Sequence, residues 1–130
     1  MTYKPQRHRG HGEKQKPKMK DSLTGKIIGA ALEVHKYLGP GLLESIYEEC
    51  LCHELGLRKI SFERQKPVNI QYKDLTTTFD YRIDLIVEDK VVVELKAVKE
   101  MHPIFEAQLL TYMKISKCKR GLLINFMCHY

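Results

Sequence analysis

Long hydrophobic runs are absent from this chain of 130 residues, and its four cysteines are poorly spaced for metal binding. No run approaches the roughly 20 apolar residues that cross a bilayer, and the first 20 residues lack the apolar segment of a secretory signal. The sequence has no Cys-x-x-Cys pair and no cysteine with a histidine at zinc-finger spacing. We therefore expect no membrane partner, a cytoplasmic location and reduced thiols, with a zinc site built from Cys50, His53 and a distant partner as the alternative.

Net charge is also absent from most of the chain. The formal charge of +6 belongs to residues 1–20, which carry seven basic residues and one acidic residue, whereas residues 21–130 carry 15 of each sign. Because residues 1–20 are also poor in apolar side chains, we expect a basic disordered tail, followed by one domain over residues 21–130. Such a tail either attracts phosphate backbones without regard to sequence or is a dispensable solvated extension.

Hydrophobic periodicity predicts seven elements in the body of the chain. Three- and four-residue steps between apolar side chains indicate helices at about 22–38 and 43–55. Pro103, a favoured first-turn residue, marks the start of a third helix at about 103–115. Alternating or continuous β-branched segments indicate strands at 68–72, 75–87, 91–96 and 120–126. The order is α-α-β-β-β-α-β, in which the first three strands are mostly antiparallel and the last follows a helical crossover to a parallel neighbour.

Charges inside one apolar hairpin are the most informative feature. If Val87 pairs with Val91 across the turn at 88–90, Asp84 falls directly opposite Glu94. Because side chains alternate along a strand, Lys96 then shares a face with Glu94. Like charges placed opposite each other destabilise a sheet, and a hard divalent cation that takes carboxylate oxygens would compensate them. The pattern favours a metal-dependent phosphodiester site over the alternative, which is the solvent face of an amphipathic hairpin.

Each charged residue would have a distinct role in such a site. Asp84 and Glu94 would hold Mg²⁺ or Mn²⁺, with the backbone carbonyl of Leu95 as an extra ligand. The metal would lower the pKa of a bound water and neutralise charge on the phosphate. Lys96 would position or activate the attacking water, or stabilise the developing charge.

Three further residues are ambiguous from spacing alone. Glu44 borders the apolar face of the second helix, where it either meets solvent or points into a cleft. Gln108 and Tyr112 are four residues apart and share one helix face. They either contact phosphate and water or simply face solvent and core.

Several segments together resemble a known family. Residues 39–47, Gly-Pro-Gly-Leu-Leu-Glu-Ser-Ile-Tyr, match the motif that names the GxxExxY proteins, with Gly41, Glu44 and Tyr47 at the named positions. The resemblance continues in order through segments at 31–35, 81–85, 93–97, 106–112 and 122–126. It therefore covers nearly the whole expected domain, and the GxxExxY family belongs to the PD-(D/E)XK nuclease-like superfamily.

The resemblance implies a fold and a site. The fold would be of the α/β (α+β) class, a restriction-endonuclease-like core with a central mixed four-stranded sheet flanked by helices. Asp84, Glu94 and Lys96 would be the superfamily signature, and Glu44, supplied by a helix, would be the third carboxylate ligand of the metal. Gln108 and Tyr112 match the Gln-x-x-x-Tyr motif of the exonuclease-like branch.

The expected function follows from these residues and from the resemblance. We expect a Mg²⁺-dependent nuclease, a hydrolase of nucleic acid and first of DNA, whose catalytic set is Glu44, Asp84, Glu94, Lys96, Gln108 and Tyr112. The alternative is a non-catalytic nucleic-acid-binding or interaction module that retains the fold, working with a protein partner or as a homodimer.

Overall fold

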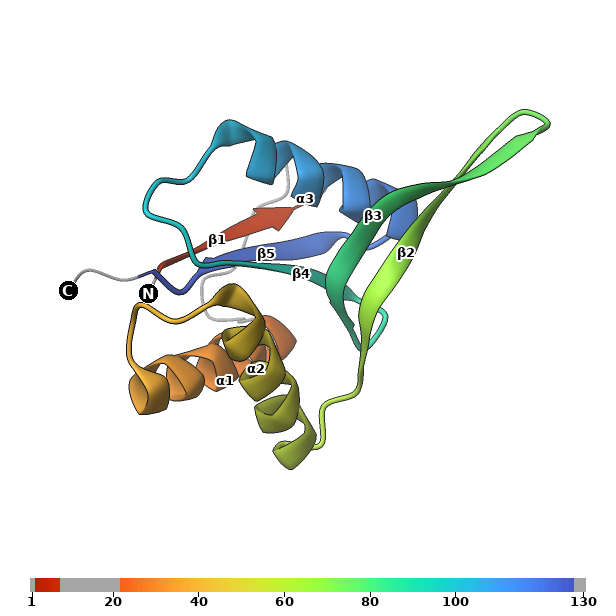
Figure 1. The fold of residues 1–130 in the computed structure, drawn as a ribbon. Coiled ribbons are helices and arrows are strands. Elements are labelled where there is room, and N and C mark those ends of the chain that lie inside the picture. Colours follow the sequence, from red (N-terminus) through yellow and green to blue (C-terminus); the bar gives the residue numbers. More distant parts are fainter. Residues whose placement is uncertain (1, 8–21, 128–130) are drawn as a thin grey trace.

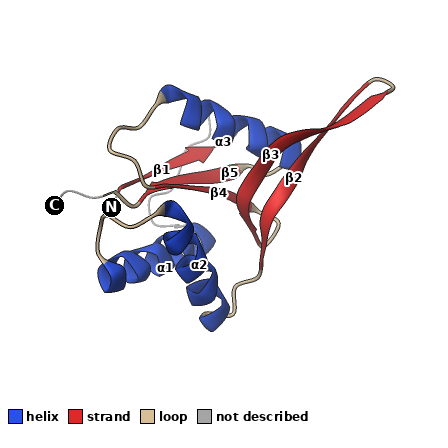
Figure 2. Ribbon diagram, in the orientation of Figure 1, coloured by secondary structure: helices blue, strands red, loops and turns tan. Residues whose placement is uncertain are grey.

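The protein forms one mixed β-sheet with helices on both faces. The computed structural model describes residues 2–7 and 22–127. Helices α1 (Ser22–Leu38) and α2 (Glu44–Leu57) cover one face of the sheet, and α3 (Pro103–Ser116) covers the other (Figures 1 and 2). Within these described ranges, no helix is long and apolar enough to cross a bilayer.

The strands are β1 (Thr2–Arg7), β2 (Phe62–Tyr72), β3 (Leu75–Val87), β4 (Val91–Lys96) and β5 (Arg120–Asn125). Their order across the sheet is β1-β5-β4-β3-β2. The β4–β5 pair is parallel and the other pairs are antiparallel. The mixed sheet flanked by helices, with the last strand parallel to its neighbour after a helical crossover, is therefore confirmed.

Strand β2 is longer than its sequence pattern indicates, beginning at Phe62 rather than near residue 68. Its pairing with β3 shifts register between Pro67 and Val68. Gln65 also adopts a left-handed backbone with φ of 54°. These irregularities break the alternation of side chains, and that alternation is the only local signal of a half-exposed strand.

Strand β1 differs from the expectation of a disordered tail over residues 1–20. Thr2–Arg7 pairs antiparallel with β5, so the sheet has five strands rather than four. Without it, β5 would present a free row of N–H and C=O groups at the edge of the sheet. Backbone pairing of this kind requires no particular side chains, so the sequence of this segment has no apolar pattern that would predict a strand. Residues 8–21 lie outside the described residues, and for them the tail remains a prediction.

Apolar side chains fill both sides of the sheet. Leu85, Val87 and Val93 belong to the core under α1 and α2, whereas Ile86 and Val92 belong to the core under α3. Helix α3 lies very close to β5, since a Cβ on Gly121 would come within 2.6 Å of Met113 Sδ. Among the polar residues of the central strands, Glu94 is therefore buried, whereas Asp84 and Lys96 are partly buried.

Candidate active site

The β3–β4 hairpin brings Asp84 and Glu94 together. Val87 pairs with Val91 and Leu85 with Val93, so the next position in the register sets Asp84 opposite Glu94. The regular backbone hydrogen bonds between β3 and β4 stop at this point, and hydrogen bonds to the two carboxylates take their place. The Asp84 N–H donates to Glu94 Oε2 at 2.8 Å, and the Leu95 N–H donates to Asp84 Oδ2 at 2.9 Å. Each carboxylate is thus fixed by the main chain of the opposite strand.

A second layer of polar side chains orients Asp84. Gln65 Nε2 donates to Asp84 Oδ1 at 3.2 Å and to both carboxylate oxygens of Glu48 at 3.0 Å. Glu48 also accepts from Arg64 Nε at 2.8 Å. The left-handed backbone of Gln65 directs its amide into this position, and such strained residues concentrate at functional sites.

Sequence reasoning missed Gln65 and Glu48. Glu48 could have been found, because it lies four residues after Glu44 and therefore shares its helix face. Gln65 gave no local signal, because its contacts depend on the irregular backbone of β2.

The loop before α2 explains the motif at residues 39–47. Gly39 and Gly41 have positive φ values of 80° and 92°, which side chains rarely tolerate. The Tyr47 hydroxyl donates to the Gly39 carbonyl at 2.6 Å and accepts from the Leu42 N–H at 3.1 Å. The Tyr47 ring stacks on Phe126 with a centroid distance of 4.4 Å. Tyr47, the tyrosine of the motif, therefore holds in place the loop that leads into α2.

Glu44 occupies the first turn of α2 and is partly buried. Burial raises the pKa of its carboxyl, and the negative charge of Asp84 raises it further. The positive charge of Lys96 acts in the opposite direction. Glu44 therefore lies within electrostatic reach of the hairpin carboxylates.

The two hairpin carboxylates are costly to ionise. Glu94 is 4% exposed, and burial, followed by the charge of Asp84, raises its pKa to about 8. Burial also raises the pKa of Asp84, while its hydrogen bond from the Leu95 N–H acts against that rise. Among the described side chains of residues 23–127, neither carboxylate forms an ion pair with lysine or arginine. A cation bound beside them would therefore favour their ionised forms.

Lys96 is near the carboxylates but points to the α3 layer. Its Nζ lies 4.3 Å from the centroid of the Phe105 ring, in a cation–π arrangement. Its charge favours the ionised forms of Asp84 and Glu94, which places it within electrostatic range of both.

Helix α3 contributes Tyr112 and Gln108 from the opposite side to α2. Tyr112 is buried, and burial, together with the charges of Glu94 and Asp84, raises the pKa of its hydroxyl to about 12. Gln108 lines a cavity next to Tyr112. In the part of the chain that the structure describes, the Gln108 amide reaches neither carboxylate by a hydrogen bond.

The Leu95 carbonyl points toward Asp84 and Glu94, which together we call the carboxylate patch. Lys96 O accepts from the N–H of Phe126, the residue directly after β5, at 2.8 Å, whereas the Leu95 N–H bonds to Asp84 on the β3 side. Because successive residues of a strand direct their backbone groups to opposite sides, the Leu95 carbonyl faces the β3 side with its own N–H.

A hard divalent cation suits the chemistry of this patch, although the ligand set is small. All the candidate donors are oxygens, and the carboxylates have no ion-pair partner in the described part of the chain. No three Asp, Glu, His or Cys side chains in the described ranges lie close enough to hold a metal ion together. Glu44 is therefore not gathered into a three-carboxylate cage. Coordination would rest on Asp84, Glu94, the Leu95 carbonyl and water, a pattern common for Mg²⁺.

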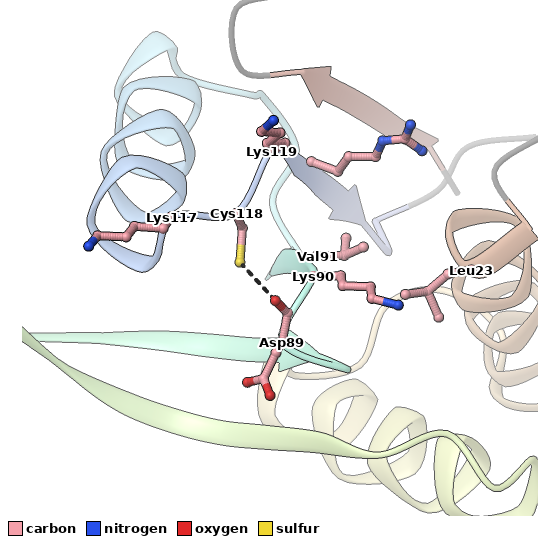
Figure 3. A pocket seen from close by; sticks show the side chains of 8 residues that line it. Leu23, Asp89, Lys90, Val91, Lys117, Cys118 and Lys119 are labelled. Atoms are coloured by element: carbon pink, nitrogen blue, oxygen red, sulfur yellow. Dashed lines mark hydrogen bonds between the residues drawn. The ribbon is translucent and has the colours of Figure 1, made fainter.

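A second hollow lies at the opposite end of β4, beside the β3–β4 turn. It has a volume of about 510 Å³ and is lined by Lys90, Lys117, Lys119 and Arg120 among others. Figure 3 shows Lys117 and Lys90 pointing in opposite directions, while Cys118 Sγ lies 3.8 Å from the Asp89 carbonyl. Because these cations diverge rather than meet, the hollow is a weaker candidate for chemistry than the carboxylate patch.

Comparison with known proteins agrees with this geometry. No curated protein and no solved structure matches the chain. A family model described as the PD-(D/E)XK nuclease superfamily matches residues 21–130. That match spans both helical layers, the four strands from β2 to β5 and every candidate residue described above. The chain therefore belongs to the PD-(D/E)XK nuclease superfamily.

Proposed function

We propose that this protein is a nuclease that uses Mg²⁺ or Mn²⁺ to hydrolyse phosphodiester bonds in nucleic acid, with DNA as the first substrate to test. The observation that carries the proposal is the Asp84–Glu94 pair. Glu94 is buried and Asp84 partly buried, each is held by the main chain of the opposite strand, and neither has a cationic partner among the described side chains. Membership in the superfamily supports it. We further propose that the chain falls in the GxxExxY branch and acts in the cytoplasm.

The residues of the patch would divide the work. Asp84, Glu94 and the Leu95 carbonyl would bind the cation, and Glu44 would reach it through water. When bound, the cation would supply an acidified water and offset charge on the phosphate. Gln65 would keep Asp84 in its ligating orientation, as its 3.2 Å hydrogen bond suggests.

Lysine, tyrosine and glutamine side chains would contact the substrate and the attacking water. Lys96 would leave the Phe105 ring to orient the attacking water or to stabilise charge on the phosphate. Tyr112 would stay protonated and donate its hydroxyl hydrogen, because its pKa is raised to about 12. The Gln108 amide would donate to a phosphate oxygen from the same helix face.

A second candidate is a nucleic-acid-binding module without turnover. It is favoured by the position of Lys96 over Phe105 and by the lack of a three-residue metal cluster in the described ranges. Such a module would bind nucleic acid equally well with and without divalent cation, and its Lys96 would be dispensable.

Hydrolysis assays separate the two candidates. Linear and circular DNA, and RNA of matched length, would be incubated with Mg²⁺, Mn²⁺ or EDTA. We expect cleavage only with the cation, and a loss of about 100-fold or more in Asp84→Asn and Lys96→Ala. The exposed Lys99 provides a matched control, and Lys99→Ala should retain activity. Full activity in EDTA or in Lys96→Ala would contradict the proposed site.

A further inference from the structure

Strands β2 and β3 form a long hairpin, which we call the β2–β3 arm. An apolar cavity of about 520 Å³ lies between this arm and α3. Val68, Ile70, Phe79 and Tyr81 line it from the arm, and Gln108 and Tyr112 line it from α3. We call it the aromatic cavity. The arm continues past α3 into the two-stranded projection seen in Figure 1. The cavity therefore lies where the arm leaves the body of the protein.

Two aromatic rings in this cavity remain open to solvent. Phe79 is 45% exposed and Tyr81 is 54% exposed, and their ring centroids lie 6.4 Å apart. Side chains of this size usually close onto the core, where they contribute most to stability. Here both rings line a space between β3 and α3, where a flat ligand can reach them.

Tyr112 links the aromatic cavity to the strands that carry the two carboxylates, since it packs in one core cluster with Ile83 of β3 and Val92 of β4. Tyr112 also lies within electrostatic reach of Glu94 and Asp84. The Gln108 amide makes no hydrogen bond with any side chain in the described part of the chain, so its donor and acceptor are free to meet a ligand. A ligand in the cavity would thus contact Tyr112 and Gln108, on the side of the sheet that carries α3.

We propose that the aromatic cavity receives an unpaired nucleobase next to the scissile phosphate, so that the substrate is single-stranded nucleic acid or a frayed end rather than intact duplex. This inference rests on the proposed function. Aromatic rings stack on bases of any sequence, and amide and hydroxyl groups read base edges. A base inside a duplex would first have to leave its stack and its partner, whereas an unpaired base does not.

Binding measured without turnover tests this inference directly. Fluorescence anisotropy in EDTA would compare a labelled single-stranded oligonucleotide with the duplex of the same length. We expect the parent protein to bind the single strand about tenfold or more tightly. Tyr81→Ala should lose most of that preference, and Tyr81→Phe should keep it because the ring remains. Tyr37→Ala is the matched control, since Tyr37 is 84% exposed on α1 and far from the cavity in sequence and layer.

Different results would separate this inference from the proposed function. Equal affinity for single strand and duplex, or an unchanged preference in Tyr81→Ala, would overturn the nucleobase assignment even if metal-dependent cleavage is found. Loss of the preference in Tyr81→Ala, together with no cleavage of any substrate, would uphold the assignment and defeat the nuclease. A parent dimer that becomes monomeric in Tyr81→Ala would show instead that a second copy covers the cavity.

Discussion

At the scale of single residues, the buried carboxylate of Glu94 lowers the free energy of unfolding of the cation-free protein. It keeps a hydrogen bond from the Asp84 N–H, yet burial raises its pKa to about 8. The unfolded chain has a carboxyl pKa near 4.3. Between these two values the folded protein holds more protons than the unfolded chain, so the free energy of unfolding falls as pH rises through this window. The burial of Glu94 thus destabilises the cation-free protein at neutral and alkaline pH.

Replacing Glu94 with glutamine should therefore stabilise the cation-free protein in a pH-dependent way. Glutamine retains an oxygen that accepts from the Asp84 N–H and carries no charge. For Glu94→Gln we expect the free energy of unfolding in EDTA to rise by about 1–3 kcal/mol at pH 8 and to change little at pH 5. Urea unfolding at both pH values measures it, with the exposed Glu100→Gln as control. A gain of equal size at both pH values would mean that ionisation is not the cause.

Tyr47 provides a prediction about the glycine loop. Tyr47→Phe removes the hydroxyl that joins the Gly39 carbonyl to the Leu42 N–H, and keeps the ring that stacks on Phe126. We expect a loss of about 1–2 kcal/mol in the free energy of unfolding, measured by urea titration. Tyr37→Phe is the comparison, because its side chain is exposed on α1. If both variants unfold alike, the hydroxyl does not hold the loop.

At the scale of elements, β1 protects one edge of the sheet. The Phe126 N–H bonds to Lys96 O, so Ile124, two residues earlier, also directs its N–H toward β4. Leu123 then directs its N–H toward β1, where it faces Lys4. Pro5 falls opposite Leu122, a position that requires no N–H from β1.

Removing residues 1–18 should expose that edge selectively. We expect amide hydrogen exchange to accelerate at Leu123 by about tenfold or more, since local opening would no longer have to break β1 pairing. Ile124 is the internal control, because its amide faces β4 and should keep its protection. Equal protection of the two amides after the deletion would show that β1 does not shield β5 in solution.

The elements that sequence could predict are those with a strong period. Helix α1 was expected at about 22–38, because its apolar side chains recur every three or four residues, and the structure places it at Ser22–Leu38. The β3–β4 hairpin was expected because a tight turn fixes its register. The first half of β2 was hidden by the irregular backbone at Gln65. Strand β1 was hidden because antiparallel backbone pairing requires no particular side-chain pattern.

At the scale of the whole molecule, the candidate site joins the three layers. Helices α2 and α3 lie on opposite faces of the sheet (Figure 1). The sheet supplies Asp84, Glu94 and Lys96, α2 supplies Glu44, and α3 supplies Tyr112. The hairpin pair could be found from strand spacing alone. Glu44, Gln108 and Tyr112 were singled out only by family resemblance, because spacing within one helix does not say what it packs against. Neither strand spacing nor family resemblance indicated Gln65, because its contact with Asp84 joins residues 19 apart in sequence and depends on a local distortion of the backbone.

The proposed chemistry depends above all on a divalent-cation site at Asp84 and Glu94, and calorimetric titration of Mn²⁺ into the purified protein tests that site most directly. We expect one saturable binding event in the parent, its loss in Glu94→Gln and its retention in Glu100→Gln. Binding that survives unchanged in Glu94→Gln would contradict the assignment of this site, as would the absence of binding in the parent both alone and with nucleic acid present.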